Sequence, residues 1–271
     1  MSARAGTVVH WNPRRPVIGG RVGKLIPIRR QVRNFGDLLG PIIVAKMLDR
    51  SGIQPNTSPR HDLLSIGSIM HFAEDGATIW GTGINGKVDS SAHTFEHLDV
   101  RAVRGPRTRE RLLEMGITTP EVFGDPGLLV SVLWDRDDWL DARAGRSTPV
   151  TIIPNLNDMR RYDRSDPRVV DPRRPIAEVI ARVLQSELVV ASSLHGIVVA
   201  DAFGIPAALV RSPHEPLFKY EDYFFGTNRG TVLAHQDVET AIRRGPHEPL
   251  RWEPDALLDA FPTDLFAWKE R

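Results

Sequence analysis

The chain alternates short apolar runs, rich in β-branched residues, with segments of helical periodicity. This alternation limits the available folds more than any other feature, because strand–helix–strand order favours parallel sheets covered by helices. We therefore expect an α/β protein. The predicted strands are residues 7–11, 63–66, 78–80, 100–103, 121–123, 150–153, 188–191 and 207–210. The predicted helices are residues 38–50, 106–115, 175–185, 195–203, 217–225, 239–244 and 256–269.

A polar, charged stretch at residues 135–147 separates the two sets of elements and is interpreted as a linker. Two such sets joined by one linker favour two Rossmann-like domains that face each other across a cleft. We expect the first domain to span residues 1–134 and the second residues 148–271, with the last helix free to pack back on the first domain.

Charge is balanced over the whole chain but not along it. The chain has 35 Lys and Arg and 34 Asp and Glu, a formal net charge of +1. This balance argues against nucleic acid as the main partner. The first 36 residues, however, hold eight basic residues and no acidic one. This stretch suits phosphate, anionic lipid or an anionic glycan, but a solvated basic face explains it as well.

The absence of cysteine excludes disulfides, thiolate catalysis and cysteine-based zinc sites. No run of 18 apolar residues predicts a membrane span, and the start of the chain has no apolar signal core. We therefore expect a cytoplasmic protein, with peripheral contact at the inner membrane face as an open alternative.

The strongest site candidate is His195, which opens a predicted helix directly after a buried strand and two serines. Ligands of open parallel sheets bind at the carboxyl ends of the strands, and a histidine there can bind an anion or move a proton near neutral pH. The alternative is a buried histidine that serves packing alone.

Four loops of the first half also carry small and polar residues after predicted strands or before predicted helices. They are residues 34–37 (Asn-Phe-Gly-Asp), 67–68 (Gly-Ser), 81–85 (Gly-Thr-Gly-Ile-Asn) and 104–107 (Arg-Gly-Pro-Arg). Glycines allow close approach of a ligand, and helix N-termini attract anions. Asp37 suits the N-cap position of the following helix. Ordinary turn chemistry remains the alternative, and residues 81–83 lack the third glycine of a dinucleotide fingerprint.

Two further groups admit two interpretations each. Arg104 and Arg107 can bind a carboxylate or phosphate through two hydrogen bonds. The alternative is that both are ordinary surface arginines. Residues 219–224 (Lys-Tyr-Glu-Asp-Tyr-Phe) combine aromatic rings that could stack on a sugar with acids that could bind its hydroxyls. The same spacing fits a surface helix that packs its aromatic residues inward.

Five motifs together resemble the polysaccharide pyruvyl transferase family. They are residues 34–37 (Asn-Phe-Gly-Asp), 79–83 (Ile-Trp-Gly-Thr-Gly), 103–106 (Val-Arg-Gly-Pro), 123–126 (Phe-Gly-Asp-Pro) and 192–196 (Ser-Ser-Leu-His-Gly), within a resemblance that spans roughly residues 30–225. The resemblance implies two Rossmann-like domains arranged as in GT-B glycosyltransferases. It also implies a transferase that moves the pyruvyl group of phosphoenolpyruvate onto a sugar of a cell-surface polysaccharide or glycolipid precursor, forming a ketal and releasing phosphate.

The resemblance implies that Arg104 binds the donor's phosphate or carboxylate and that His195 binds the donor or acts as general acid–base. No metal and no cofactor beyond the donor substrate are implied. The expected substrate-binding residues are Asn34, Gly36, Asp37, Gly67, Ser68, Gly81, Thr82, Gly83, Asn85, Arg107, Ser192, Ser193, Lys219, Tyr220 and Asp222. Many members carry arginine just before Leu-His-Gly, where this chain has Ser193, so other arginines or Lys219 would supply that charge.

Two other functions stay open at this point. One is a GT-B-type glycosyltransferase that uses a nucleotide sugar, although the second half lacks an acidic residue clearly placed to hold a ribose. The other is a glycan-binding relative without catalysis, which Ser193 would fit. The acceptor sugar, the ketal stereochemistry and the oligomeric state are not determined by the sequence.

Overall fold

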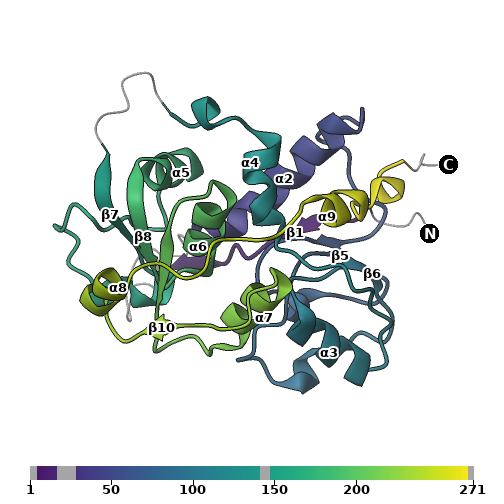
Figure 1. Cartoon of the computed structure of the whole chain (residues 1–271). Helices are drawn as coiled ribbons and strands as arrows, with labels where there is room; N and C mark the ends of the chain where they lie inside the picture. Colours follow the sequence, from purple (N-terminus) through teal and green to yellow (C-terminus); the bar gives the residue numbers. More distant parts are fainter. Residues whose placement is uncertain (1–4, 17–28, 141–146, 268–271) are drawn as a thin grey trace.

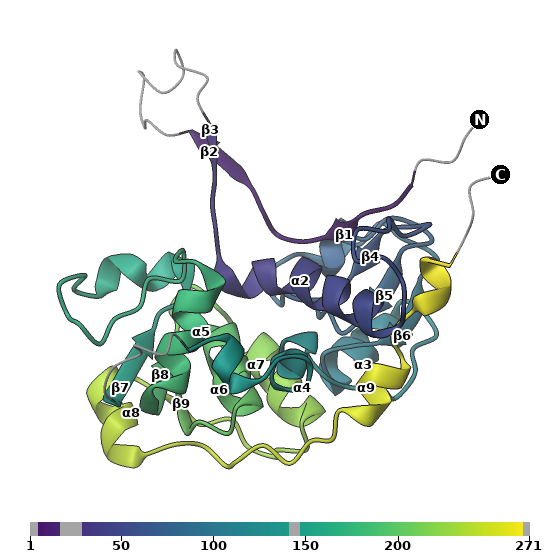
Figure 2. The same cartoon turned by 90° about the horizontal axis from the view of Figure 1, so that it is seen from above.

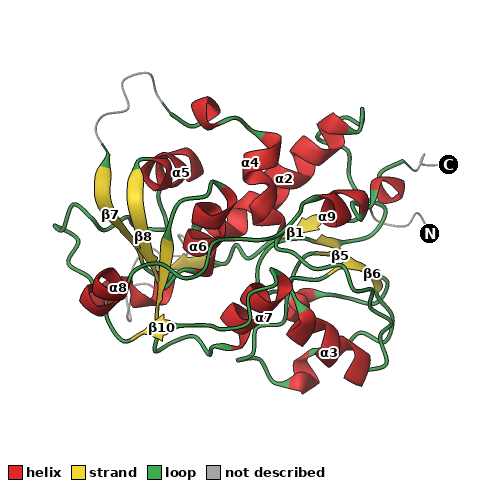
Figure 3. Cartoon of the chain, viewed as in Figure 1, coloured by secondary structure: helices red, strands yellow, loops and turns green. Residues whose placement is uncertain are grey.

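The computed structural model describes residues 5–16, 29–140 and 147–267. Two four-stranded parallel sheets form its frame (Figures 1 and 3). The strands of the first sheet, in spatial order, are β1 (Val8–Val9), β4 (Leu63–Leu64), β5 (Thr78–Trp80) and β6 (Asp99–Ala102). Those of the second are β10 (Ala234–His235), β9 (Ala207–Val210), β8 (Ser186–Ala191) and β7 (Thr148–Ile153). The α/β prediction is confirmed at this level, whereas the GT-B-like arrangement and the domain boundaries stay predictions.

Helices lie between and around the sheets, and one hydrophobic cluster runs through both halves of the chain. The helices are α2 (Phe35–Arg50), α3 (Pro106–Glu114), α4 (Val130–Leu133), α5 (Ile176–Leu184), α6 (Leu194–Ala202), α7 (Phe218–Gly226), α8 (Val238–Arg244) and α9 (Asp255–Asp259). Leu39 and Ile43 of α2 share this cluster with Val179 of α5 and Ile197 of α6. The core therefore fixes the facing loops of the two sheets relative to each other.

The start of α2 differs from the prediction. The helix begins at Phe35 rather than Leu38, Asn34 occupies the N-cap position, and Asp37 lies in the first turn. The backbone N–H of Phe35 donates to the carbonyl of Pro172 at 2.9 Å, and the Phe35 side chain is fully buried. This contact with the second half starts the helix early, and no local pattern could predict it.

The predicted closing helix at residues 256–269 is wrong. The chain forms α9, then a short 3₁₀ turn at Thr263–Leu265, and residues 268–269 lie outside the described ranges. Pro262 explains the break, because proline has no N–H to donate and disfavours helical geometry in the residue before it. The segment packs on the first sheet instead, where Trp80 Nε1 donates to the carbonyl of Leu257 at 2.9 Å.

One predicted strand is shorter than expected, and the predicted linker is described only in part. The strand at residues 121–123 is a single parallel bridge between Val103 and Phe123. The predicted linker begins with a short 3₁₀ helix at Arg136–Asp138, stabilised by a capping box with Asp135, and residues 141–146 lie outside the described ranges.

An antiparallel ribbon that the sequence did not predict joins β1 to α2. Its strands are β2 (Arg14–Pro16) and β3 (Arg29–Gln31), and it projects from the body of the molecule (Figure 2). Arg14 and Arg30 are exposed on it. Across the described residues, no helix combines the length and apolar character needed to cross a bilayer.

Candidate active site

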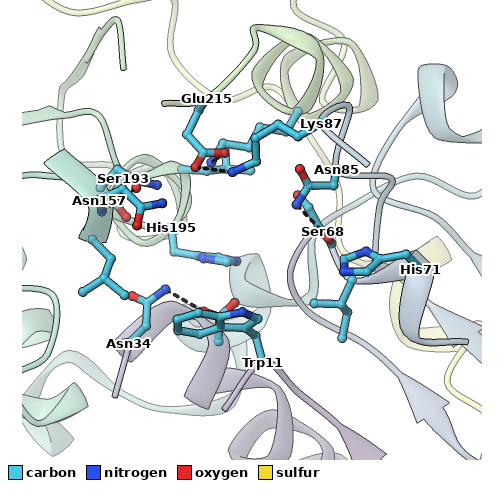
Figure 4. Close-up of a pocket in the computed structure, with 16 residues that line it drawn as sticks. Trp11, Asn34, Ser68, His71, Asn85, Lys87, Asn157, Ser193, His195 and Glu215 are labelled. Carbon is cyan, nitrogen blue, oxygen red and sulfur yellow. Dashed lines mark hydrogen bonds and ion pairs between the residues drawn. The ribbon is translucent and has the colours of Figure 1, made fainter. Parts of the chain in front are cut away.

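A polar pocket lies where loops from both sheets meet (Figure 4). The first half contributes Trp11, the start of α2 and the loops that follow β4 and β5. The second half contributes the loops that follow β7, β8 and β9, together with Lys219 of α7. The loops therefore come from the carboxyl ends of parallel strands, which is the usual ligand-binding edge of an open α/β sheet.

His195 occupies the centre of this pocket (Figure 4). It lies in the first turn of α6, where the Ser193 hydroxyl caps the helix by accepting from the N–H of Gly196 at 3.3 Å. The imidazole packs directly on Gly36, where a Cβ atom would collide with Nδ1. Glycine at position 36 is therefore required for the ring to stand where it does.

The imidazole faces a second buried group, the carboxyl of Asp125. Nε2 of His195 lies 3.7 Å from Asp125 Oδ2, too far for a hydrogen bond, and both atoms lack a hydrogen-bond partner within the described ranges. Unsatisfied buried polar atoms are rare in folded proteins and often mark functional sites. The other oxygen of Asp125 accepts from the N–H of Gly127 at 2.9 Å.

Burial sets the protonation of this centre. It lowers the pKa of His195 to about 3, helped by the positive charges of Lys219 and Arg104. It raises the pKa of Asp37 to about 7 and that of Asp125 to about 6. Asp37 Oδ2 accepts from Asn34 Nδ2 at 2.6 Å. Near neutral pH the imidazole is therefore neutral, while the Asp37 carboxyl is partly protonated.

Two lysines share one carboxylate at the opposite wall. Glu215 accepts from Lys87 Nζ at 2.7 Å and from Lys219 Nζ at 2.9 Å. Burial lowers the pKa of Lys219 despite the neighbouring Glu215. Lys87 comes from the first half and the other two residues from the second, so this cluster bridges the halves. Two cations against one anion favour an anionic ligand.

Arg104 lies behind the pocket wall rather than in it. It is fully buried, and its Nε donates to Asp222 Oδ2 at 3.0 Å and its Nη1 to the Ser68 hydroxyl at 2.6 Å. A Cβ on Gly83 would collide with the guanidinium, so this glycine makes room for it. Arg104 therefore reaches the pocket through Ser68, and its charge is neutralised by Asp222.

The aromatic segment of α7 packs inward, as the alternative interpretation expected. Asp222 is fully buried and accepts from the N–H of Thr108 at 2.8 Å as well as from Arg104. Tyr220 is also fully buried, and its hydroxyl donates to the carbonyl of Ser192 at 2.7 Å. Neither side chain lines the pocket, because both are committed to joining α7 to its neighbours.

The remaining expected residues fall into three groups. Those lining the pocket beside His195 are Asn34, Asp37, Ser68, Asn85, Ser193 and Lys219. Those that support it from behind are Gly36, Gly67, Gly81, Thr82, Gly83 and Ser192. Arg107 stands apart, because it pairs with Glu221 at 2.9 Å and lies over the rings of Phe218 and Phe225.

The sequence interpretation missed several lining residues: Trp11, His71, Lys87, Asn155, Asn157 and Glu215. Asn155 and Asn157 follow β7, so the rule that ligands bind at strand carboxyl ends would have indicated them. Trp11 ended a predicted strand, so the same rule would have indicated it too. His71 lay in an irregular loop and gave no such signal.

Comparison with known proteins assigns a family to this fold and pocket. A family model described as polysaccharide pyruvyl transferase matches residues 56–214. The chain is 30% identical over 138 residues to the succinoglycan biosynthesis protein ExoV of Rhizobium meliloti (strain 1021), a match that covers 46% of this chain and 39% of that protein. The chain therefore spans well under half of the length of this relative.

Among solved structures, a functionally uncharacterised protein from Klebsiella pneumoniae matches with a TM-score of 0.37 and 13% sequence identity. That match covers 70% of this chain and 83% of the Klebsiella protein.

Proposed function

The chain belongs to the polysaccharide pyruvyl transferase family, and from this premise we propose that it transfers the pyruvyl group of phosphoenolpyruvate to a sugar of a polysaccharide or glycolipid precursor. The product is a pyruvate ketal, and phosphate is released. The similarity to a succinoglycan biosynthesis protein supports an exopolysaccharide as the destination.

The observation that carries this proposal is the charge arrangement of the pocket. Phosphoenolpyruvate bears a carboxylate and a phosphate, so its site must supply positive charge. Lys87 and Lys219 share the single carboxylate of Glu215, and the N-termini of α2 and α6 both lie at the pocket. Helix N-termini and lysines attract anions, and here they come from both halves of the chain. Lys219 takes the role of the cation missing at Ser193.

Ketal formation also needs a proton on the methylene carbon of the donor. That carbon becomes a methyl group and its neighbour an oxocarbenium-like centre, to which the first sugar hydroxyl adds. Loss of phosphate regenerates the centre and the second hydroxyl adds. Of the two hydroxyl protons, one leaves with the phosphate and one restores the acid. Asp37 is the best-placed proton source, because its pKa of about 7 leaves it partly protonated at neutral pH. In this scheme Asp37 supplies the first proton, and the expected general acid–base role of His195 becomes that of a proton acceptor.

His195 takes the second proton transfer in this scheme. A neutral imidazole can accept a proton from an attacking hydroxyl, and a bound dianionic donor would raise its pKa from about 3 toward the useful range. Arg104 acts through Ser68, whose hydroxyl it holds at 2.6 Å on the pocket wall. We assign Arg104 as a positioning residue, since Asp222 already occupies its guanidinium.

The antiparallel ribbon of β2 and β3 carries exposed arginines, which would suit an acceptor linked to a membrane lipid. Exposed Arg14 and Arg30 would approach the anionic inner face of the membrane or the acceptor's own phosphates. The protein would then be cytoplasmic and only peripherally bound. Co-sedimentation with anionic and neutral vesicles tests this part, and equal binding to both would contradict it.

Incubation with phosphoenolpyruvate and a panel of glycan acceptors tests the main proposal. We expect phosphate release coupled to a ketal detected by mass spectrometry, and loss of both in His195→Ala. Calorimetry with phosphoenolpyruvate alone provides the second readout. Absence of both turnover and donor binding would contradict the proposal. Thermal stabilisation by nucleoside diphosphates, but not by phosphoenolpyruvate, would favour a glycosyltransferase instead.

A further inference from the structure

The pocket has two chemically different walls. One carries the charged cluster of Lys87, Glu215 and Lys219 described above. The other is built from Trp11, His71 and Asn85 and presents rings and an amide rather than charges. Figure 4 shows Trp11 and Glu215 on opposite sides of the pocket, with His195 between them. A donor with two anionic groups fits the first wall, which leaves the second without an assigned ligand.

Trp11 is anchored and still open to the pocket. It is partly buried and packs on the hydrophobic cluster of the first sheet that includes Leu64 and Ile79. The same residue lines the pocket. An indole held in this way offers a rigid apolar surface, and the polarised C–H groups of a pyranose ring favour the negative face of an aromatic system.

Two polar atoms of this wall lack a hydrogen-bond partner among the described residues, which favours a ligand with hydroxyl groups. Asn85 Nδ2 donates to the carbonyl of Ser68 at 3.2 Å, but Asn85 Oδ1 is buried without a hydrogen-bond partner among the described residues. Nδ1 of His71 is likewise buried without a hydrogen-bond partner among the described residues. Burial and the nearby His93 lower the pKa of His71, so this ring is neutral. A neutral imidazole and an amide oxygen can each bond a sugar hydroxyl.

We propose that the wall formed by Trp11, His71 and Asn85 is the subsite for an uncharged sugar ring of the acceptor, with the Trp11 indole as its platform. This inference rests on the proposed function and identifies which part of the same pocket holds which substrate. The Trp11 indole lies across the pocket from Glu215 with His195 between them, so a sugar stacked on the indole faces His195 and the donor. Donor and acceptor then bind at separate places and do not compete.

The test measures the two ligands separately on the full chain. Methyl β-D-galactopyranoside and methyl β-D-glucopyranoside are the acceptor probes, observed by saturation-transfer NMR and titration. L-Phospholactate, which lacks the double bond and cannot be transferred, is the donor probe for calorimetry. Trp11→Ala and Trp11→Phe are compared with Trp139→Phe, a half-buried tryptophan outside this pocket.

We expect Trp11→Ala to weaken glycoside binding roughly tenfold and Trp11→Phe about two- to threefold, since a smaller ring keeps part of the stacking. Asn85→Ala should weaken it severalfold through the lost hydroxyl contact. Phospholactate affinity should stay within about twofold in all variants, and Trp139→Phe should match the parent. Glycoside should also bind in the presence of saturating phospholactate.

Three results would overturn this inference. They are no glycoside binding by a parent protein that binds phospholactate, equal losses of both ligands in Trp11→Phe, and displacement of glycoside by phospholactate. The proposed function survives all three. It fails only if neither phospholactate nor phosphoenolpyruvate binds, so the two failures are distinguishable. Trp11→Phe decides the outcome if Trp11→Ala does not fold.

Discussion

Two clusters of buried ionisable groups in this protein have opposite character. In the second half, Asp201 accepts from the Tyr223 hydroxyl at 2.7 Å and from Arg229 Nη2 at 2.8 Å, and lies 3.1 Å from His247 Nε2. In the pocket, Asp125 and His195 each leave a buried atom without a partner among the described residues. The Asp201 carboxylate is satisfied by these three side chains, although Nδ1 of His247 has no partner among the described residues. The pocket differs because Asp125 and His195 face each other with both of these facing atoms unpaired, which leaves capacity for a ligand.

The pKa shifts follow the same division. Burial alone would raise the pKa of Asp201, but the hydrogen bond from His247 and the charge of Arg229 outweigh it and hold the pKa below its ordinary value. Burial dominates at Asp37 and raises its pKa to about 7. The ionised Asp201 carboxylate is therefore expected to stabilise the fold, whereas the raised pKa of Asp37 suits proton transfer. Matched Asp→Asn substitutions can separate these roles.

The largest effect is expected for Asp37→Asn in catalysis. The amide keeps the shape but cannot deliver a proton, so kcat should fall by about 10²- to 10⁴-fold. Phospholactate affinity, measured by calorimetry, should change little. A variant with near-parental kcat would exclude Asp37 as the acid and return that role to His195 or Asp125.

Asp201→Asn should act on stability instead. It leaves the buried Arg229 guanidinium without its counter-charge, and breaking a buried pair costs about 3–5 kcal/mol. Urea unfolding measures this loss, while phospholactate affinity of the folded variant should be retained. If Asp37→Asn lost as much stability as Asp201→Asn, the contrast between the two clusters would be refuted.

A smaller effect concerns the pH dependence of stability. Folding raises the pKa of Asp37. Its contribution to the free energy of unfolding is therefore complete at low pH and is lost as pH rises through about 7. Folding lowers the pKa of His195, so the contribution of this residue to the free energy of unfolding is lost in the other direction, as pH falls below about 6.5. Between pH 6.5 and 8 the parent should therefore lose about 1 kcal/mol that Asp37→Asn does not lose. If the urea midpoints of the two proteins changed equally with pH across this window, the assignment would be contradicted.

The smallest effect is expected at Lys87, whose side chain is 38% exposed beside Glu215. Solvent screens a charge at such a position, so Lys87→Gln should weaken phospholactate binding only about threefold. Lys46→Gln is the matched control, because Lys46 pairs with Asp49 on α2 away from the pocket. Equal effects at both lysines would mean that Lys87 contributes only general charge.

Local patterns predicted the frame of this fold well. The strands at residues 78–80 and 207–210 have the predicted bounds, because apolar β-branched runs between turn signals leave little choice. The same patterns placed His195 at the start of a helix that follows a strand. The rule about strand carboxyl ends then located the pocket, since it depends on topology and not on side-chain detail.

What the sequence did not reveal depends on partners far away along the chain. Arg104 looked like a free cation after a strand, but Asp222, 118 residues later, neutralises it. The protonation of Asp37 follows from burial, which no neighbouring residue indicates. Long-range pairing and burial are the two quantities that periodicity cannot supply.

The return of the final segment to the first sheet has a consequence for how the pocket is held. The chain leaves that sheet after β6 and comes back at Trp252, whose Nε1 donates to the carbonyl of Phe123 at 3.0 Å. Two covalent crossings thus join the sheets, and a body tethered at two points keeps far less rotational freedom than one tethered at a single point. The entropy of bringing the pocket walls together is therefore lost during folding and not on substrate binding, which leaves more of the binding energy for the reaction itself.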